Sequence, residues 1–261
     1  MSGLGRRART LAGMAATLGA AAACAAFGGI AESRRALEEP GRAAAETTSG
    51  PNGSLIYAAR TSVGVIVVDL GWSGADGALR RALARLGATP RDVVAVLLTH
   101  SHRDHVGAWR LVAHAPFWVG PGERALLLGE AAHGGWVARW ADRVWRPRLP
   151  RAGALTIREL AGDTALVFGP DTVRAFALPG HTAGSVAWLV RGVLFVGDGM
   201  SHDKTDGRLR PARPSFSASV PTARASLARV AAAVALLDVR LVCTAHARCA
   251  PPRPALAAAL R

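Results

Sequence analysis

The sequence predicts an α/β protein in which two β-sheets pack face to face beneath outer helices. The chain has 261 residues, half of them hydrophobic, which is enough to bury a large core. Short apolar runs rich in β-branched residues occur in both halves of the chain, as expected for strands. Helical stretches accompany the strand blocks in each half, which is typical of layered α/β folds. Only 19% of the residues are charged, so the composition argues against a disordered chain.

The first half of this body begins with a predicted β-hairpin. Apolar runs at 55–59 and 63–70 flank a short polar turn, as two paired strands would. A helix follows and ends at Gly87, because apolar residues before this glycine recur every three or four positions. The run 93–98 then predicts a buried strand, and another helix is expected from about residue 106.

The second half repeats this pattern of strands and helices. A final helix is expected at 222–237, because the segment is rich in Ala and Leu. The predicted strands of this half lie near 165–168, 173–178, 186–190, 193–196 and 240–244.

The N-terminal residues differ in composition from the rest. Three arginines precede an apolar stretch that runs to about residue 31, and small residues come just before Glu32, as in an export signal. Residues 1–31 are therefore expected to be a signal peptide or membrane-targeting segment, and this segment is the one expected membrane contact. The protein would then be exported or associated with the cell envelope; a cytoplasmic enzyme with an Ala-rich extension is the alternative. Residues 32–52 are expected to be a linker or a short helix.

The chain is strongly basic, with a formal charge of +14, and arginine supplies nearly all of the positive charge. A field of this sign would draw anionic ligands toward a cleft. However, Lys204 is the single lysine, Asn52 is the single asparagine and glutamine is absent, which indicates a bias of amino-acid usage. A solvated Arg-rich surface is therefore the preferred interpretation, and no nucleic-acid partner is expected.

Three cysteines do not make a disulfide framework. Cys243 and Cys249 are six residues apart near the C-terminus. They would bridge in an exported protein and would otherwise remain buried thiols that pack as small apolar residues. The sequence leaves both possibilities open.

One short segment carries most of the chemistry. The motif His100-x-His102-x-Asp104-His105 places three imidazoles and a carboxylate directly after a predicted strand. Alternate residues at a strand end can point the same way, which would aim His100 and His102 at one metal ion. Asp104 and His105 lie past the bend and could reach a second ion. Since a single zinc takes about four ligands, the motif favours two sites.

More residues of ligand type follow further along the chain. His181, Asp198 and His246 each come at or just after the end of a predicted strand, where functional loops collect. Together with the His-rich segment they predict a site for two divalent metal ions. Imidazole-rich ligation suits Zn²⁺ best, and the carboxylates also allow Fe or Mn.

In this order, the motifs resemble those of the metallo-β-lactamase fold hydrolase superfamily. The matching segments are 100–105, Pro-Gly-His-Thr-x-Gly-Ser at 179–185, Phe-x-Gly-Asp at 195–198, and His246. The resemblance covers about residues 53–251 and implies a four-layer αββα sandwich. Residues 53–261 are therefore expected to form one hydrolase domain.

The resemblance also implies a role for each matching residue. Asp69 is similar to the aspartate that supports the metal loop in this family. The implied ligands are His100, His102 and His181 for one metal, Asp104, His105 and His246 for the other, and Asp198 as a bridge between them.

Two features separate this chain from other branches of the family. His246 is flanked by Ala where most relatives have Gly-His-Gly, which predicts a differently shaped loop. A bridging Asp198 is similar to the glyoxalase II-type thioesterases, lactonases and phosphodiesterases, whereas zinc β-lactamases have Cys or Ser in that part of the site. A flavin-partnered di-iron oxidoreductase is disfavoured, because the second histidine of the loop would be Glu and a flavodoxin domain would be present.

The resemblance implies a hydrolase of small-molecule substrates. A hydroxide that bridges two metal ions would attack a small ester, thioester or lactone. Asp104 is the candidate catalytic residue that orients this hydroxide and later carries its proton. The alternatives are a β-lactam hydrolase and a metal-dependent phosphodiesterase or nuclease. A metal-binding protein without turnover is a further alternative, disfavoured by the full ligand set.

Substrate-binding residues are less clearly marked. Trp136 and Trp140 share one helical face between the metal motif and His181, where they would either pack in the core or line a hydrophobic lid. His202, four residues past Asp198, is the remaining histidine expected to touch substrate. Two others, His114 and His133, are expected to be ordinary surface or loop histidines.

Overall fold

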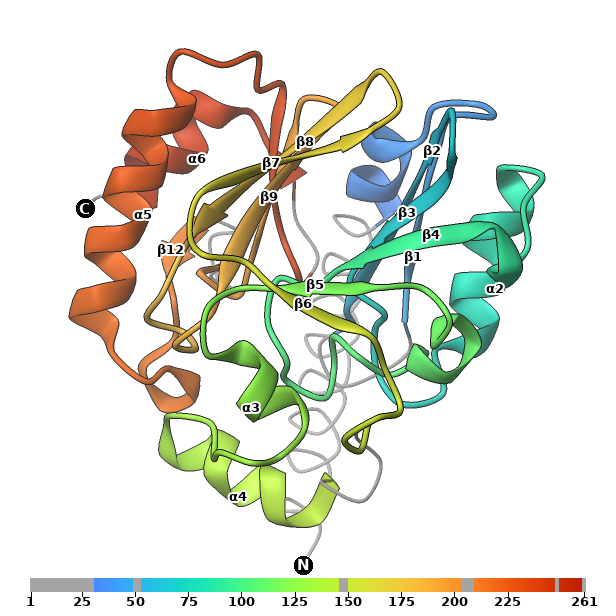
Figure 1. Ribbon diagram of the computed structural model, residues 1–261. Coiled ribbons are helices and arrows are strands. Elements are labelled where there is room, and N and C mark those ends of the chain that lie inside the picture. The colour runs from blue at the N-terminus through green and yellow to red at the C-terminus, as the bar shows by residue number, and fades with distance from the viewer. Residues whose placement is uncertain (1–30, 49–52, 146–149, 203–208, 247–248, 260–261) are drawn as a thin grey trace, which may run out of the picture.

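Two six-stranded sheets face each other at the centre of the molecule, and helices cover their outer faces (Figure 1). The computed structural model describes residues 31–48, 53–145, 150–202, 209–246 and 249–259. Helix α2 (Asp76–Arg85) packs on the first sheet, and α5 (Val220–Val234) and α6 (Pro252–Ala259) pack on the second. The expected αββα sandwich is therefore confirmed.

The first sheet has the order β1-β2-β3-β4-β5-β6. It is antiparallel from β1 to β3 and parallel from β3 to β6. The β2–β3 hairpin and the buried β4 confirm the strands expected from the first half of the sequence. The strands are β1 (Ala43–Thr47), β2 (Leu55–Thr61), β3 (Gly64–Val68), β4 (Val93–Leu97), β5 (Phe117–Val119) and β6 (Ile157–Glu159).

The second sheet has the order β14-β13-β10-β9-β8-β7, with β10 and β13 parallel and the other pairs antiparallel. All five strands expected from the second half of the sequence are present. A small β11–β12 ribbon stands beside them. The strands are β7 (Thr164–Phe168), β8 (Asp171–Ala177), β9 (Val186–Val190), β10 (Val193–Gly197), β11 (Met200–His202), β12 (Leu209–Pro211), β13 (Leu241–Thr244) and β14 (Cys249–Ala250).

Alternation along the strands creates the layers. In β3, Val65 and Val67 pack toward α2, whereas Ile66 and Val68 pack toward the second sheet. Each large apolar side chain buried in this way contributes about 1.5–3 kcal/mol. The remaining helical segments are α3 (Glu123–Leu127), α4 (Trp136–Trp145) and the 3₁₀ turns Pro90–Asp92, Trp109–Val112 and Pro214–Phe216.

The sequence explains where α2 and α5 begin and end. Asp76 in the first turn of α2 and Arg85 in its last turn complement the helix dipole. Gly87 follows with a φ of 63°, a conformation that glycine adopts readily and that ends the helix. At the start of α5, the Ser219 side chain accepts a hydrogen bond from the Thr222 N–H, and Pro221 occupies the first turn.

The helix expected from about residue 106 is replaced by the short 3₁₀ turn Trp109–Val112. The reason is tertiary: the N–H of Gly107 donates to Gly71 O at 2.7 Å, and that of Ala108 donates to Leu70 O at 3.1 Å. These two N–H groups therefore bond to the segment after β3 instead of to carbonyl groups within a helix. A Cβ at position 107 would lie 1.8 Å from Trp72 O, so glycine is required at this close approach.

The segment 32–52, expected to be a linker, contributes to the fold. Residues 31–37 are helical, and β1 pairs with β2 with Ala43–Ala45 buried. Glu46 of β1 accepts a 2.5 Å hydrogen bond from Arg85 of α2. The first sheet therefore begins before residue 53. The sequence did not reveal this strand because β1 is mostly alanine and has a single β-branched residue, Thr47.

Of the expected targeting segment, residues 1–31, all but residue 31 lie outside the described residues. Within the described ranges, the structure contains no helix with both the length and the apolar character needed to cross a bilayer.

Candidate metal centre

The seven predicted ligand residues come together at one end of the sandwich. The His-rich segment 100–105 directly follows β4, His181 follows β8, Asp198 follows β10 and His246 follows β13. The carboxyl ends of β4, β10 and β13 supply six of these seven side chains, and His181, from the turn after β8, is the seventh.

Three imidazoles form the first group. His100 Nε2 lies 3.0 Å from His102 Nδ1, and His181 Nε2 lies 3.2 and 3.0 Å from these two atoms. Ligands at about 2.0–2.1 Å on a tetrahedral zinc would be about 3.3 Å apart, so this spacing fits the corners of one coordination sphere. All three nitrogens lie close enough to one another to share a single metal ion.

Asp104, His105 and His246 form the second group, and their ligand atoms also converge. His246 Nε2 lies 3.2 Å from Asp104 Oδ2 and 3.2 Å from Asp198 Oδ2. Asp198 Oδ2 is in turn 3.7 Å from His181 Nε2 of the first group. Asp198 therefore stands between the two groups, as the resemblance implied.

The chemistry of the donor set fits divalent metal ions. Among the described residues, His105 Nε2 and Asp198 Oδ1 are buried without a hydrogen-bond partner. A buried polar atom without a partner is costly, and a cation offers such atoms a partner. His105 Nε2 and Asp198 Oδ1 lie 3.9 Å apart, too far for a hydrogen bond and suitable for a shared ion.

Hydrogen bonds orient the rings of this site. Asp69, at a φ of 53°, accepts 2.8 Å hydrogen bonds from Thr99 N, Thr99 Oγ1 and His105 Nδ1. Because Nδ1 of His105 is held by this carboxylate, its Nε2 is left facing the metal site. His246 Nδ1 similarly donates to Gly53 O at 2.7 Å. His181 Nδ1 lies 3.1 Å from Ser217 Oγ.

The two groups differ in electrostatics. Burial and the neighbouring imidazoles hold the pKa values of His100 and His102 well below the ordinary histidine value. Burial lowers the pKa of His181 to about 4, although Asp198 opposes the shift. These rings are therefore neutral at physiological pH, the form that binds metals.

In the second group the carboxylates dominate. Burial alone would lower the pKa of His105, but Asp69, Asp104 and Asp198 outweigh it and raise the pKa to about 9. Burial opposes ionisation of Asp198, yet the charges of His246 and the other histidines push its pKa below its usual range. Both carboxylates beside His246 therefore stay ionised and can neutralise a divalent cation.

A buried hydrogen-bond network that sequence reasoning missed joins the two ligand-bearing turns. Glu123, fully buried at the start of α3, accepts 2.6 Å hydrogen bonds from Ser101 N and Ser101 Oγ through one carboxylate oxygen. Its other oxygen accepts from Thr182 Oγ1 at 2.8 Å and from Gly184 N at 3.1 Å. This side chain therefore holds the segment containing His100 and His102 against the turn that carries His181.

His133 was expected to be an ordinary surface or loop histidine, and the surface interpretation is wrong. Its side chain is buried, and its ring centroid lies 4.5 Å from that of His102. His133 Nε2 lies 2.9 Å from Ser101 Oγ, and Nδ1 lies 2.8 Å from Asp142 Oδ1 of α4. The residue links α4 to the metal loop. His114, by contrast, is exposed, with Nε2 3.2 Å from Val93 O.

Two tryptophans of α4, Trp136 and Trp140, lie on the surface, so the core-packing interpretation is wrong for them. Trp136 and Trp140 are 69% and 62% exposed. The residues before α4 nevertheless pack close to the site. A Cβ added to Gly134 would lie 2.3 Å from Ala218 Cβ. Ala218 directly follows Ser217, whose hydroxyl contacts His181. The α4 helix is thus a neighbour of the metal centre. His202 ends β11, and its side chain lies outside the described residues.

Comparison with known proteins supports the family. A family model described as the metallo-beta-lactamase superfamily matches residues 49–246. The hydroxyacylglutathione hydrolase of Aeromonas hydrophila is 30% identical over 195 residues, covering 75% of this chain and 61% of that protein. The hydroxyacylglutathione hydrolase of Gloeobacter violaceus is 38% identical over 119 residues, covering 45% of this chain and 37% of that protein. The chain thus spans less than two thirds of either relative.

A solved structure shows the same fold. The protein TTHA1623, crystallised in a di-iron-bound form, superposes with a TM-score of 0.59 at 24% identity, covering 82% of this chain and 98% of that one. The family model spans most of the chain, and the ligand-type side chains converge at the strand ends as described above. The chain therefore belongs to the metallo-β-lactamase superfamily.

Proposed function

We propose that this chain is a dinuclear metallohydrolase that cleaves small thioesters, with esters and lactones as related substrates. The observation that carries the proposal is the pair of ligand groups with Asp198 between them. One group alone would support a single ion. Two groups that share a carboxylate are what a two-metal hydrolase requires.

The proposed ligand assignment follows the two groups. His100, His102 and His181 would hold one ion, Asp104, His105 and His246 the other, and Asp198 would contact both. When bound, two divalent cations supply Lewis acidity both to the scissile carbonyl and to the attacking water. Zn²⁺ suits these ligands best, and Fe or Mn would also be accepted by the carboxylates.

Asp104 is the proposed catalytic residue. Its side chain is partly buried among ionic groups, with Oδ2 at 3.2 Å from His246 Nε2. Burial opposes its ionisation, but His105 and His246 outweigh this effect and lower the pKa of its carboxyl group. An ionised carboxylate in this place accepts a hydrogen bond from the attacking water, orients it, and can carry its proton to the leaving group.

The preference for thioesters rests on the relatives. The two hydroxyacylglutathione hydrolases are 38% and 30% identical to the parts of this chain that they match, and their name describes thioester cleavage. Because this chain covers only part of their length, the acyl and thiol portions of the substrate are left as a chemical class. The net charge of +14 favours anionic substrates.

The test is metal analysis together with a substrate panel. Purified protein should contain two metal equivalents and should hydrolyse an anionic thioester with at least about tenfold higher kcat/KM than a penicillin or a phosphodiester, a difference of about 1.4 kcal/mol in transition-state binding. Faster cleavage of the penicillin or the phosphodiester would replace the thioester proposal with that alternative. Failure of the metal-loaded protein to cleave any substrate would favour a binding role without turnover.

A histidine pair gives a matched control for this test. His246→Ala removes a proposed ligand, whereas His114→Ala makes the same change at an exposed histidine outside the site. The first variant should lose metal and activity, and the second should retain both. Equal behaviour of the two variants would contradict the ligand assignment.

We also propose that the protein is exported or held at the cell envelope, in contact with the membrane through its N-terminal segment alone. The basic and apolar residues before Glu32 support this location, and so does the disulfide between Cys243 and Cys249, a bond that persists in oxidising compartments. Fractionation of the source cells, with N-terminal sequencing of the recovered protein, is the test. Recovery in the cytoplasm with residues 1–31 attached would contradict the proposal.

A further inference from the structure

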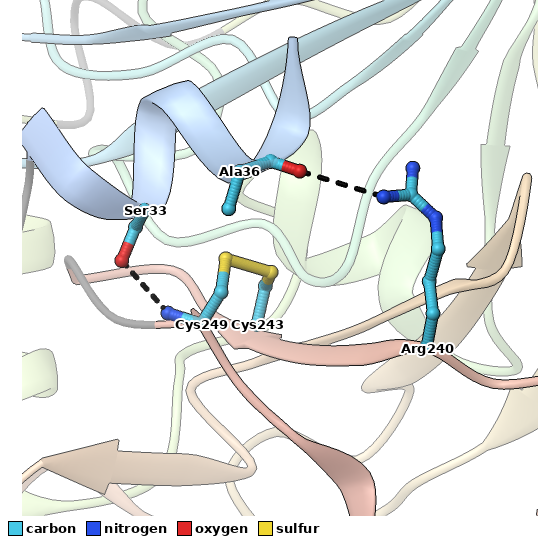
Figure 2. The surroundings of a disulfide bond; sticks show 5 residues. All are labelled: Ser33, Ala36, Arg240, Cys243 and Cys249. Atoms are coloured by element: carbon cyan, nitrogen blue, oxygen red, sulfur yellow. Dashed lines mark hydrogen bonds between the residues drawn. A yellow bond between two sulfur atoms is a disulfide. The ribbon is translucent and has the colours of Figure 1, made fainter. Parts of the chain in front are cut away.

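His246 lies in a seven-residue segment that is closed by a disulfide. Cys243 and Cys249 face each other across the antiparallel pair β13–β14, and their sulfurs are bonded (Figure 2). The bridge therefore encloses the turn that carries His246, three residues from each cysteine. No other proposed ligand lies inside this ring, since the remaining ones follow β4, β8 and β10.

The part of the turn before His246 is held by the sheet. Ala245 N donates to Gly197 O at 3.1 Å, Leu55 N donates to Ala245 O at 2.9 Å, and His246 Nδ1 donates to Gly53 O. These bonds tie Ala245 to the residue just before Asp198. They leave the return of the chain after His246 to be fixed by other contacts.

The return is fixed at Cys249. Its strand, β14, has two residues, so the sheet ladder on this side is short. Besides the disulfide, the N–H of Cys249 donates to Ser33 Oγ at 2.9 Å, a contact from the helical residues 31–37 (Figure 2). Arg240, just before β13, reaches the same helical segment through Ala36 O at 3.4 Å (Figure 2). Among the described residues, the bridge thus closes the turn covalently at the end where the sheet ladder is short.

Closing a short loop removes conformations in which its residues are out of place. A ligand side chain that is already in position loses less conformational entropy when a metal ion binds, so the protein binds the ion more tightly. His246 Nε2 is 3.2 Å from carboxylate oxygens of both Asp104 and Asp198, which is a placement that a looser turn would lose. The first ligand group, His100, His102 and His181, lies on other elements, so loosening this turn would leave its geometry unchanged.

We propose that the Cys243–Cys249 disulfide positions His246 and thereby controls occupancy of the second metal site, so that reduction converts a two-metal protein into a one-metal protein. The inference rests on the ligand assignment of the proposed function. Reduction by a dithiol transfers two electrons: a thiolate of the dithiol displaces one cysteine sulfur, and its second thiol then releases the other. Two cysteine thiols and the oxidised dithiol result. Cys249 is the accessible side, because it is half-buried whereas Cys243 is buried.

The test compares metal binding in three proteins. Wild-type protein, a Cys243→Ala/Cys249→Ala double variant and a Ser33→Ala control are loaded with Zn²⁺ and titrated with a chromophoric chelator. The control removes the hydrogen bond to Cys249 N but keeps the bridge. For the double variant we expect one tight equivalent to remain and the second to weaken by about tenfold to fiftyfold, the range that loop closure over this length allows. The control should stay within about threefold of wild type.

The outcomes separate this inference from the proposed function. If wild-type protein binds fewer than two equivalents, the dinuclear proposal itself fails. If wild type and double variant bind two equivalents with equal affinity, the positioning role alone is overturned. Wild-type protein reduced with a phosphine provides a second measurement that needs no mutation. Parallel loss of both equivalents in the double variant and the reduced protein would also overturn the inference, because the bridge would then support the whole fold.

Discussion

Replacing Glu123 with Gln tests whether a buried carboxylate holds the two ligand-bearing turns together. In the native protein this carboxylate accepts four hydrogen bonds, two on each oxygen. Each oxygen faces one backbone N–H, from Ser101 or from Gly184, and a backbone N–H cannot turn away. Whichever way the glutamine amide is oriented, its NH₂ group opposes one of these donors.

The cost follows from that geometry. A buried N–H left without an acceptor costs about 1–3 kcal/mol, and the remaining hydrogen bonds lose the strengthening that a charged acceptor gives, about 1 kcal/mol. We therefore expect Glu123→Gln to lower the free energy of unfolding by about 2–4 kcal/mol. Urea denaturation of the metal-free protein measures this directly. Affinity for the first metal should also fall, because His100, His102 and His181 lie on the two turns that the carboxylate joins.

Glu130→Gln is the matched control. Glu130 is 46% exposed at its side chain and pairs with Arg124 at the surface, so its loss should change the unfolding free energy by less than about 1 kcal/mol. If Glu123→Gln had the same free energy of unfolding as this control, the carboxylate would not stabilise the contact between the two turns, and the reasoning would be refuted.

Three other predictions concern different parts of the molecule. Asp104→Ala should lower kcat by a factor of about 100 or more with the fold retained, as judged by circular dichroism; activity near wild type would remove its catalytic role. Trp136→Ala and Trp140→Ala should change the unfolding free energy by no more than about 0.5 kcal/mol, because both side chains are exposed, and a larger loss would show that α4 packs through them. Tyr57 is the single tyrosine, and burial, followed by the charge of Glu39, raises the pKa of its hydroxyl above the ordinary value near 10. Its phenolate absorbance should therefore be absent from folded protein at pH 10, and stability should be full below that pH and fall as the pH rises further; normal titration in the folded state would contradict its burial.

The sequence was sufficient to predict which candidate ligand residues converge, because the relevant pattern is local. Four ligand residues lie within 100–105, and each of the others follows a strand whose β-branched run is easily recognised. The ends of such strands meet at one edge of a sandwich, so order along the chain translated into proximity in space. The layered fold was predictable for the same reason, since strand and helix periods were clear in both halves.

The supporting residues could not be predicted because their roles come from contacts between distant segments. In the sequence, Glu123 looks like an ordinary acidic residue at the start of a helix, which is a common surface feature. His133 lies among small and polar residues without a neighbouring ligand in the chain. Their partners, Ser101 and Asp142, belong to the metal loop and to α4, and the sequence holds no pattern that pairs them.

The early start of the fold limits how the N-terminus could be trimmed. Removal of the chain up to residue 31 would leave β1 in place, whereas trimming past Thr47 would strip β1 from the sheet and leave β2 as a bare outer strand with its backbone donors and acceptors unpaired. Such exposed edges invite association between copies of a chain. The proposed removal of residues 1–31 would therefore have to end before β1, and a product shortened into β1 should appear as aggregate rather than as a smaller soluble protein.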